Sequence, residues 1–200
     1  MGEVMNYIDE LKRYIPKNTQ EESDLKIMLD WALKYSDNCL LRENTVAHFS
    51  ASAWVVNETM DKVLLNYHNL YKNWGWLGGH ADGESDLLKV ALKEVNEESG
   101  LKNIKPLIDD VISVEILPVT YHVKNNKFVS SHLHMNLTYL IVGDETEELV
   151  IKPDENSGLK WVKLEEVLSM TNEECMKPIY KKLNDYLYSI KESIKNQGKI

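Results

Sequence analysis

Hydrophobic residues recur at helical spacing in the first part of the chain. The first such face ends at Pro16 and consists of Val4, Tyr7, Ile8, Leu11 and Ile15. Thr19 then begins the capping-box pattern TQEE, in which an acidic residue follows three positions later. The pattern predicts a second helix that ends near residues 36–38.

From residue 48 the pattern becomes typical of strands. FSASAWVVN (49–57) and KVLLNYHNL (62–70) flank a short polar segment and predict a hairpin. Two further strands are predicted within 110–123 and 132–143, joined by the loop KNNKFVSS, and GLKWVKLEEVL (158–168) predicts a short strand that turns into a helix. Thr171 begins a second capping-box pattern before a last amphipathic helix, which tolerates Pro178 only in its first turn.

This order of elements predicts an α/β fold, in which a sheet is covered by helices. We expect an N-terminal helical extension at residues 1–44, a central domain at 45–170, and a C-terminal helix at 171–200 that packs on that domain. No internal repeat and no linker rich in Pro, Gly or Ser indicates a second domain.

Composition and charge narrow the function. The net charge of −9 disfavours binding to a nucleic-acid duplex, which requires a basic surface. No apolar run reaches the length of a membrane span, and the N-terminus lacks an apolar signal core. Cys39 and Cys175 match no metal or redox spacing, so we expect a cytoplasmic protein with two reduced thiols.

The segment WLGGHADGESDLLKVALKEVNEESGL (76–101) carries the strongest chemical signal. On a helix from Asp86 to Ser99, an apolar stripe is formed by Leu88, Ala91, Leu92 and Val95. Glu94, Glu97 and Glu98 share the neighbouring arc, and Leu87 and Val90 occupy that same arc one to two turns earlier. The three carboxylates therefore lie at the edge of the buried face, where a divalent cation would convert their repulsion into attraction.

The loop before this helix supplies further oxygen ligands. Gly78 and Gly79 permit close backbone approach, so that a carbonyl can turn toward a ligand. Asp82, Gly83 and Glu84 predict a tight turn, and Ser85 or Asp86 is placed to cap the helix. A loop carbonyl and three helical carboxylates form an oxygen-only set suited to Mg²⁺ or Mn²⁺.

This segment resembles the signature of the Nudix hydrolases, G-x5-E-x7-R-E-U-x-E-E-x-G-U, where U is a bulky aliphatic residue. KEVNEESGL (93–101) matches the second half with Lys93 in place of Arg, and Gly79 falls on the first Gly. Ser85 occupies the position of the first Glu, and the loop GGHADGES is one residue shorter than the commoner form. The chain therefore carries a variant of the motif whose metal-binding half is complete.

The resemblance implies the Nudix fold, a mixed β-sheet sandwiched between α-helices. It also implies a pyrophosphohydrolase that cleaves a nucleoside diphosphate linked to another moiety, with Mg²⁺ or Mn²⁺ as cofactor. Metal ligands would be Glu94, Glu97, Glu98 and the Gly79 carbonyl, and one carboxylate of the cluster would act as the base. Lys93 stands where the family's Arg orients a carboxylate, and it supplies the charge without the bidentate fork.

Weaker signals concern the substrate. His80 and Asp82 lie in the short loop, where they either bind the substrate or only form the turn. His132, His134, Asn136 and Thr138 alternate onto one strand face, which either lines a substrate cleft, with His134 near the metals, or is simply hydrogen-bonded. Trp74 and Trp76 either stack on a base or pack in the core, and the loop carboxylates Glu145, Glu147 and Glu148 either ligate a metal or are solvated.

Two other functions compete with hydrolysis. One is a catalytically weak Nudix-fold module that binds or senses a nucleotide. The presence of all three carboxylates in the signature disfavours this function. The other is the isomerase branch of the family, which needs a Cys in the pocket, whereas neither Cys is near the motif in the sequence. A homodimer formed through the N-terminal helices is compatible with any of these functions.

Overall fold

A computed structural model describes residues 6–124 and 126–197, which form two compact units. The first unit comprises the described residues up to Ser52 together with 78–93 and 108–139, and the second comprises 53–77, 94–107 and the described residues from 140 onward. Strands β1 (Ala47–Asn57) and β9 (His132–Gly143) and helix α3 (Leu87–Ser99) each run from one unit into the other. The predicted order of helices, strands, helix, strands and helix is confirmed.

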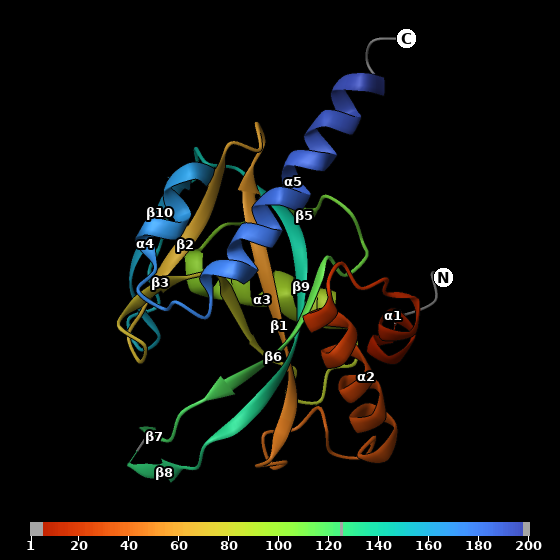
Figure 1. The fold of residues 1–200 in the computed structure, drawn as a ribbon. Helices are drawn as coiled ribbons and strands as arrows, with labels where there is room; N and C mark the ends of the chain where they lie inside the picture. The colour runs from red at the N-terminus through yellow and green to blue at the C-terminus, as the bar shows by residue number, and fades with distance from the viewer. Residues whose placement is uncertain (1–5, 125, 198–200) are drawn as a thin grey trace. The chain divides into compact units, whose positions relative to one another are not determined.

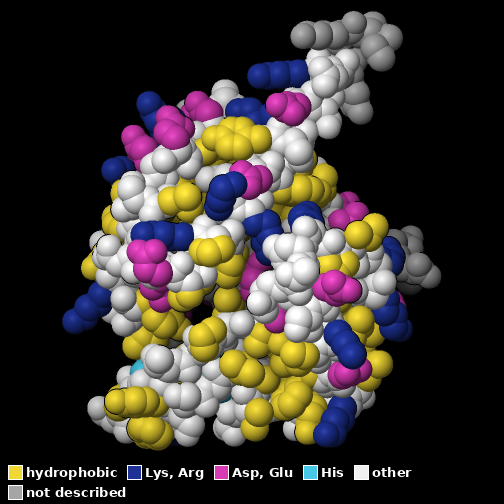
Figure 2. Space-filling model, in the orientation of Figure 1, with side chains coloured by type: hydrophobic (Ala, Val, Ile, Leu, Met, Phe, Trp, Pro, Cys, Tyr) yellow, Lys and Arg dark blue, Asp and Glu magenta, His cyan; other side chains and the backbone are white. Residues whose placement is uncertain are grey.

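The first unit is built around β6 (Ser113–Val119) and the start of β9. Both strands were predicted, and they pair antiparallel from Ser113 opposite Thr138 to Val119 opposite His132. The segment predicted as a loop between them contains a small hairpin of β7 (His122–Lys124) and β8 (Lys127–Val129). Figure 2 shows hydrophobic side chains gathered at this hairpin, where Tyr121, Val123 and Phe128 are exposed.

Two helices complete the first unit, α1 (Tyr7–Arg13) and α2 (Thr19–Lys34), and Figure 1 shows them together. The N-cap of α2 is Asn18, whose Oδ1 accepts from Glu21 N, so the prediction that Thr19 caps this helix was wrong by one residue. Helix α2 is fastened to β6 because the Asp24 carboxylate accepts a hydrogen bond of 3.1 Å from the Ile116 amide. The core of this unit includes Tyr7 and Phe49, whose ring centroids lie 4.9 Å apart.

The second unit contains the predicted hairpin of β1 and β2 (Lys62–His68), with Val56 opposite Val63. Strand β2 also pairs antiparallel with β3 (Asn73–Gly75) and with β10 (Asn156–Lys163), and β5 (Ile104–Pro106) pairs with the end of β9. In strand order the sheet runs β10, β2, β1, β9, β5, and the short β4 (Leu77–His80) pairs with β1. The 3₁₀ turn η1 (Leu164–Glu166) and helix α4 (Val167–Met170) follow β10, as the sequence predicted.

The last helix, α5 (Lys177–Gln197), begins later than its capping-box pattern suggested. Thr171 is instead the C-cap of α4, and its hydroxyl accepts from Asn73 Nδ2 at 2.8 Å. Pro178 is the second residue of α5, in the first turn where proline is tolerated. Tyr180, Leu183 and Leu187 form its buried stripe, and the Tyr180 ring lies 5.2 Å from that of Trp54. None of the helices in the described part of the chain is long and apolar enough to cross a membrane.

A buried carboxylate lies between α1 and β9 in the first unit. Glu10 is 4% exposed, and its Oε2 accepts a hydrogen bond of 2.5 Å from the Tyr139 hydroxyl. Its Oε1 is buried without a hydrogen bond among the described residues. Burial raises the pKa of Glu10 above its ordinary value of 4.5, because the charged form loses its hydration.

This raised pKa predicts a pH-dependent stability. A carboxyl whose pKa is higher in the folded state stabilises the fold below its unfolded pKa, and this contribution is lost as the pH rises through the folded value. The Glu10→Gln side chain stays neutral at every pH. We therefore expect its free energy of unfolding, relative to that of the wild type, to be higher at about pH 7 than at about pH 4. Urea unfolding at both pH values measures this difference, with Glu22→Gln on the exposed face of α2 as the control. An equal difference at both pH values would contradict the account.

Candidate functional site

Helix α3 carries the three glutamates of the sequence signature. Its N-terminus is capped by Asp86, whose Oδ1 accepts from the Lys89 amide at 3.0 Å, as predicted. Its C-terminus ends at Gly100, which adopts φ +78°, a left-handed conformation that glycine adopts without strain. Because Glu94, Glu97 and Glu98 are three and four positions apart within one continuous helix, they share one face.

That face is buried to an unusual degree for acidic residues. Glu94 is 9% exposed and Glu98 is 2% exposed, in line with Leu87 and Val90 on the preceding turns. Leu88 and Leu92, which were predicted to belong to the buried stripe, are only half-buried. The buried face is therefore rotated toward the carboxylates. Since a buried charge is costly unless it is paired or bound to a metal, the arrangement requires positive charge nearby.

The second unit surrounds these carboxylates with polar groups. Asn66 on β2 donates from Nδ2 to Glu98 Oε2 at 3.2 Å, and Asn156 donates to the Glu98 carbonyl at 2.9 Å. Lys152 Nζ lies 3.4 Å from Glu97 Oε2, so an ammonium group already partly neutralises this carboxylate. No sequence pattern identified Asn66, Asn156 or Lys152, because each lies outside the signature.

The same surroundings fit a divalent cation. The Asn66 Oδ1 atom is buried and makes no hydrogen bond among the described residues. A buried oxygen of this kind, in a side chain that touches a buried carboxylate, is a suitable ligand for a hard cation. The donor set around α3 consists of carboxylate and amide oxygens, which Mg²⁺ and Mn²⁺ prefer.

The segment before α3, from Gly78 onward, belongs to the first unit. Gly79, which was predicted in a loop, lies on β4. A Cβ atom at Gly78 would lie 2.5 Å from the Ala51 carbonyl oxygen, so only glycine fits against β1 there. Asp82 and Gly83 adopt positive φ, which confirms the predicted tight turn. Arg42 donates two hydrogen bonds of 2.6 Å to the Asp82 carboxylate, a pairing that the sequence did not reveal.

His80 and His134, which the sequence analysis assigned to different elements, are brought together. Their Nε2 atoms lie 3.1 Å apart, and His48 and His132 lie beside them. Burial, together with the nearby His48 and His132 rings, lowers the pKa of His134 to about 3, so its ring is neutral at physiological pH. His48 was not recognised from the sequence.

The rest of the polar face of β9 is an internal hydrogen-bond network. Asn136 and Thr138 are buried, and Asn136 Oδ1 accepts hydrogen bonds from the hydroxyls of Ser50 and Ser52. Of the two interpretations left open for this face, the hydrogen-bonded one therefore holds for these two residues.

The remaining weak signals have structural partners. Trp76 packs edge-on against Tyr180, with ring centroids 5.5 Å apart. The Glu145 carboxylate pairs with Lys62 at 2.5 Å, and that of Glu147 accepts from the amides of Lys102 and Asn103.

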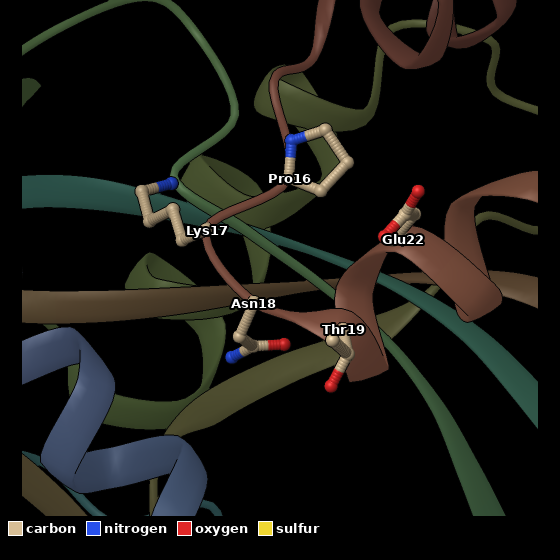
Figure 3. Close-up of a pocket in the computed structure, with 5 residues that line it drawn as sticks. All are labelled: Pro16, Lys17, Asn18, Thr19 and Glu22. Carbon is tan, nitrogen blue, oxygen red and sulfur yellow. The ribbon is translucent and has the colours of Figure 1, made fainter.

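A shallow pocket lies in the first unit where α1 joins α2. Figure 3 shows its lining, which consists of Pro16, Lys17, Asn18, Thr19 and Glu22. Its polar side chains already serve the fold, since Lys17 Nζ donates to the Ile112 carbonyl at 2.6 Å and Asn18 caps α2. The pocket shares no residue with α3 or the histidines.

Comparison with known proteins identifies the family. The family model described as NUDIX domain matches residues 46–183, more than half of the chain. The chain therefore belongs to the NUDIX family and is an enzyme of the Nudix pyrophosphohydrolase type. Members of this family act on nucleoside diphosphate derivatives and generally use divalent metal ions.

Solved structures confirm the predicted α/β Nudix fold. A NUDIX-family hydrolase from Clostridium perfringens superposes with a TM-score of 0.54 at 24% identity, covering 70% of this chain and 97% of its own. An Ap4A hydrolase from C. elegans gives 0.53 at 17% identity, covering 70% and 98%. The Nudix hydrolase RenU from M. smegmatis gives 0.52 at 16%, covering 72% and 87%. No curated protein matches the chain.

The contact at Gly78 predicts a sharp intolerance to any side chain. We expect Gly78→Ala to lower the free energy of unfolding by about 1–3 kcal/mol, because the added methyl group meets backbone atoms that have no room to move. Gly75→Ala is the matched control, since its Cβ meets one side-chain atom, the Tyr180 hydroxyl at 3.1 Å, and no backbone atom. Equal stability of the two variants in urea unfolding would show that the close approach is not a constraint.

Proposed function

We propose that this chain hydrolyses a phosphoanhydride bond in a nucleoside diphosphate linked to another moiety, in a reaction that depends on Mg²⁺ or Mn²⁺. The observation that carries the proposal is the burial of Glu94 and Glu98 on the face of α3 that also presents Glu97. A pyrophosphate is anionic, and so are these carboxylates, so the two come together only through cations.

Glu94, Glu97 and Glu98 would hold the metal, and the Gly79 carbonyl remains a ligand predicted from the signature alone. When bound, the metal supplies charge neutralisation for the phosphates and lowers the pKa of a coordinated water. The chain's own part is to fix the three carboxylates on one rigid helix, in line with the apolar residues that anchor it. Glu97 is the least buried of the three, which suits it to a role as ligand and base at the substrate side.

Lys93 adds positive charge directly before Glu94 and is exposed. We assign it to the orientation of a carboxylate, as its position in the signature implies. Because a lysine makes point contacts rather than a bidentate pair, it holds a carboxylate less rigidly than an arginine. The consequence is a slower enzyme, with the same requirement for metal.

His80, Asp82 and His134 remain proposals as substrate-binding residues. Asp82 is held by Arg42, so that pair would present a guanidinium edge as well as a carboxylate to a phosphate. His80 and His134 face one another at 3.1 Å, so they would approach a ligand together rather than singly.

The hydrolase proposal is tested with a panel of nucleoside diphosphate compounds, with phosphate release as the readout. The panel includes a dinucleoside polyphosphate, because an Ap4A hydrolase shares the fold. We expect turnover of at least one compound with Mg²⁺ or Mn²⁺. Compounds that bind without being cleaved with either metal would favour the alternative, a nucleotide-binding or sensor module.

With a substrate in hand, Glu97→Gln tests the role of the carboxylates. We expect it to lower kcat by about a hundredfold or more, because one neutral amide cannot replace a charged metal ligand and base. Glu165→Gln, an exposed substitution in η1, is the control and should leave kcat unchanged. A Glu97→Gln variant as active as this control would remove the carboxylates from the mechanism.

A further inference from the structure

Four of the six histidines in the chain meet in the first unit. His48 is near the start of β1, His80 ends β4, and His132 and His134 begin β9. One ring nitrogen from each lies within 4.8 Å of those of the others. Three strands therefore deliver imidazole groups to one point, which is independent of the carboxylates on α3.

Two of the distances between these nitrogens match those between ligands of one ion. The Nε2 atom of His134 lies 3.1 Å from Nε2 of His80 and 3.2 Å from Nε2 of His132. Two nitrogens bound tetrahedrally at the usual Zn–N distance lie about 3.3 Å apart. Hydrogen bonds alone serve this geometry poorly, because a neutral ring nitrogen has one proton or one lone pair, whereas His134 Nε2 faces two nitrogens.

Backbone carbonyls hold two of the rings in the form that binds metals. His48 Nδ1 lies 3.0 Å from the Asn44 carbonyl, and His132 Nδ1 lies 2.8 Å from the Ser130 carbonyl. Because a carbonyl only accepts, both Nδ1 atoms carry the proton, and in a neutral ring the lone pair is then on Nε2. Metal-binding histidines are oriented by the same type of bond from the other ring nitrogen.

His48 provides a separate indication of a ligand. Its side chain is 3% exposed, and its Nε2 atom is buried with no hydrogen bond among the described residues. A buried acceptor without a partner is costly, and in native proteins it usually marks a bound water, an ion or a functional group. Here that atom belongs to the group of four converging nitrogens.

We propose that His48, His80, His132 and His134 bind one divalent transition-metal ion, with Zn²⁺ as the preferred member of that class. Imidazole nitrogen suits Zn²⁺ and its neighbours, whereas Mg²⁺ requires oxygen. Four protein ligands fill a tetrahedral shell and leave no open position for water, so the site is structural, and His80 and His134 would not contact substrate directly while the ion is bound. It ties the start of β1 and the end of β4 to the start of β9.

Binding of Zn²⁺ and Co²⁺ to the full-length chain, first stripped with a chelator, tests this proposal. We expect one tight equivalent of Zn²⁺ that a large excess of Mg²⁺ does not displace. Co²⁺ reports the geometry, because tetrahedral nitrogen coordination gives intense visible absorption and octahedral oxygen coordination gives weak absorption. The wild type alone therefore distinguishes the histidines from the carboxylates of α3.

Substitutions then assign the ligands. His80→Gln and His134→Gln, both at half-buried positions, should each weaken Zn²⁺ binding by at least tenfold and abolish the intense Co²⁺ spectrum. His122→Gln is the matched control, because the His122 ring lies 6.4 Å from that of His132 but outside the cluster. Glu97→Gln should retain Zn²⁺ binding even though it alters the carboxylate site. Circular dichroism checks that each variant is folded.

Three results would overturn the proposal. They are the absence of a tight Zn²⁺ equivalent in the wild type, a Co²⁺ spectrum of purely octahedral type, and unchanged Zn²⁺ affinity in the folded histidine variants. Loss of Zn²⁺ binding in Glu97→Gln, with retention in the histidine variants, would assign the ion to α3. Because hydrolysis is not measured, these outcomes are separate from failure of the proposed enzymatic function.

Discussion

Burial of negative charge on α3 is the constraint on which the account of this chain depends. Glu94 and Glu98 lose most of their hydration, and Asn66 donates one hydrogen bond to the Glu98 carboxylate. A helix that needed only an amphipathic face would carry apolar residues at these positions. A divalent cation held by the carboxylates, as we propose, would offset the cost of burying them, and the NUDIX family to which the chain belongs generally uses divalent ions.

The two candidate metal sites differ in ligand chemistry. The second unit presents carboxylate and amide oxygens, and the first unit presents imidazole nitrogens. A hard cation such as Mg²⁺ prefers oxygen ligands, and a borderline cation such as Zn²⁺ prefers imidazole nitrogens. The two ions would therefore not compete for the same site. The carboxylate site would serve reaction with an anionic substrate. The histidine site would join strands in a part of the chain where the described cysteines are free and form no disulfide.

Local patterns predicted much of this structure. The spacing of Glu94, Glu97 and Glu98 placed them on one helical face, and the strands predicted within 110–123 and 132–143 are present as β6 and β9. The predictions that were wrong concern the ends of helices, where another residue competes for the capping interaction. Asn18, one position before Thr19, offers an equally good capping oxygen, and Thr171 is occupied by a long-range bond to Asn73.

What the sequence could not reveal depends on contacts between distant segments. His48, His80 and His134 converge only because three strands lie adjacent, and no spacing in the chain encodes that. Asn66 and Lys152 likewise reach the α3 carboxylates from β2 and from the segment before β10. In the sequence, the only sign that the buried face of α3 is rotated toward Glu94 and Glu98 was that Leu87 and Val90 share their arc of the helix. The burial of all four residues in the structure confirmed that sign.

Anomalous diffraction from a crystal of the full-length chain grown with Mn²⁺ tests the central claim most directly. The account predicts a manganese peak within coordination distance of the carboxylates of Glu94, Glu97 and Glu98. Manganese bound elsewhere, with these carboxylates held only by protein groups, would contradict it.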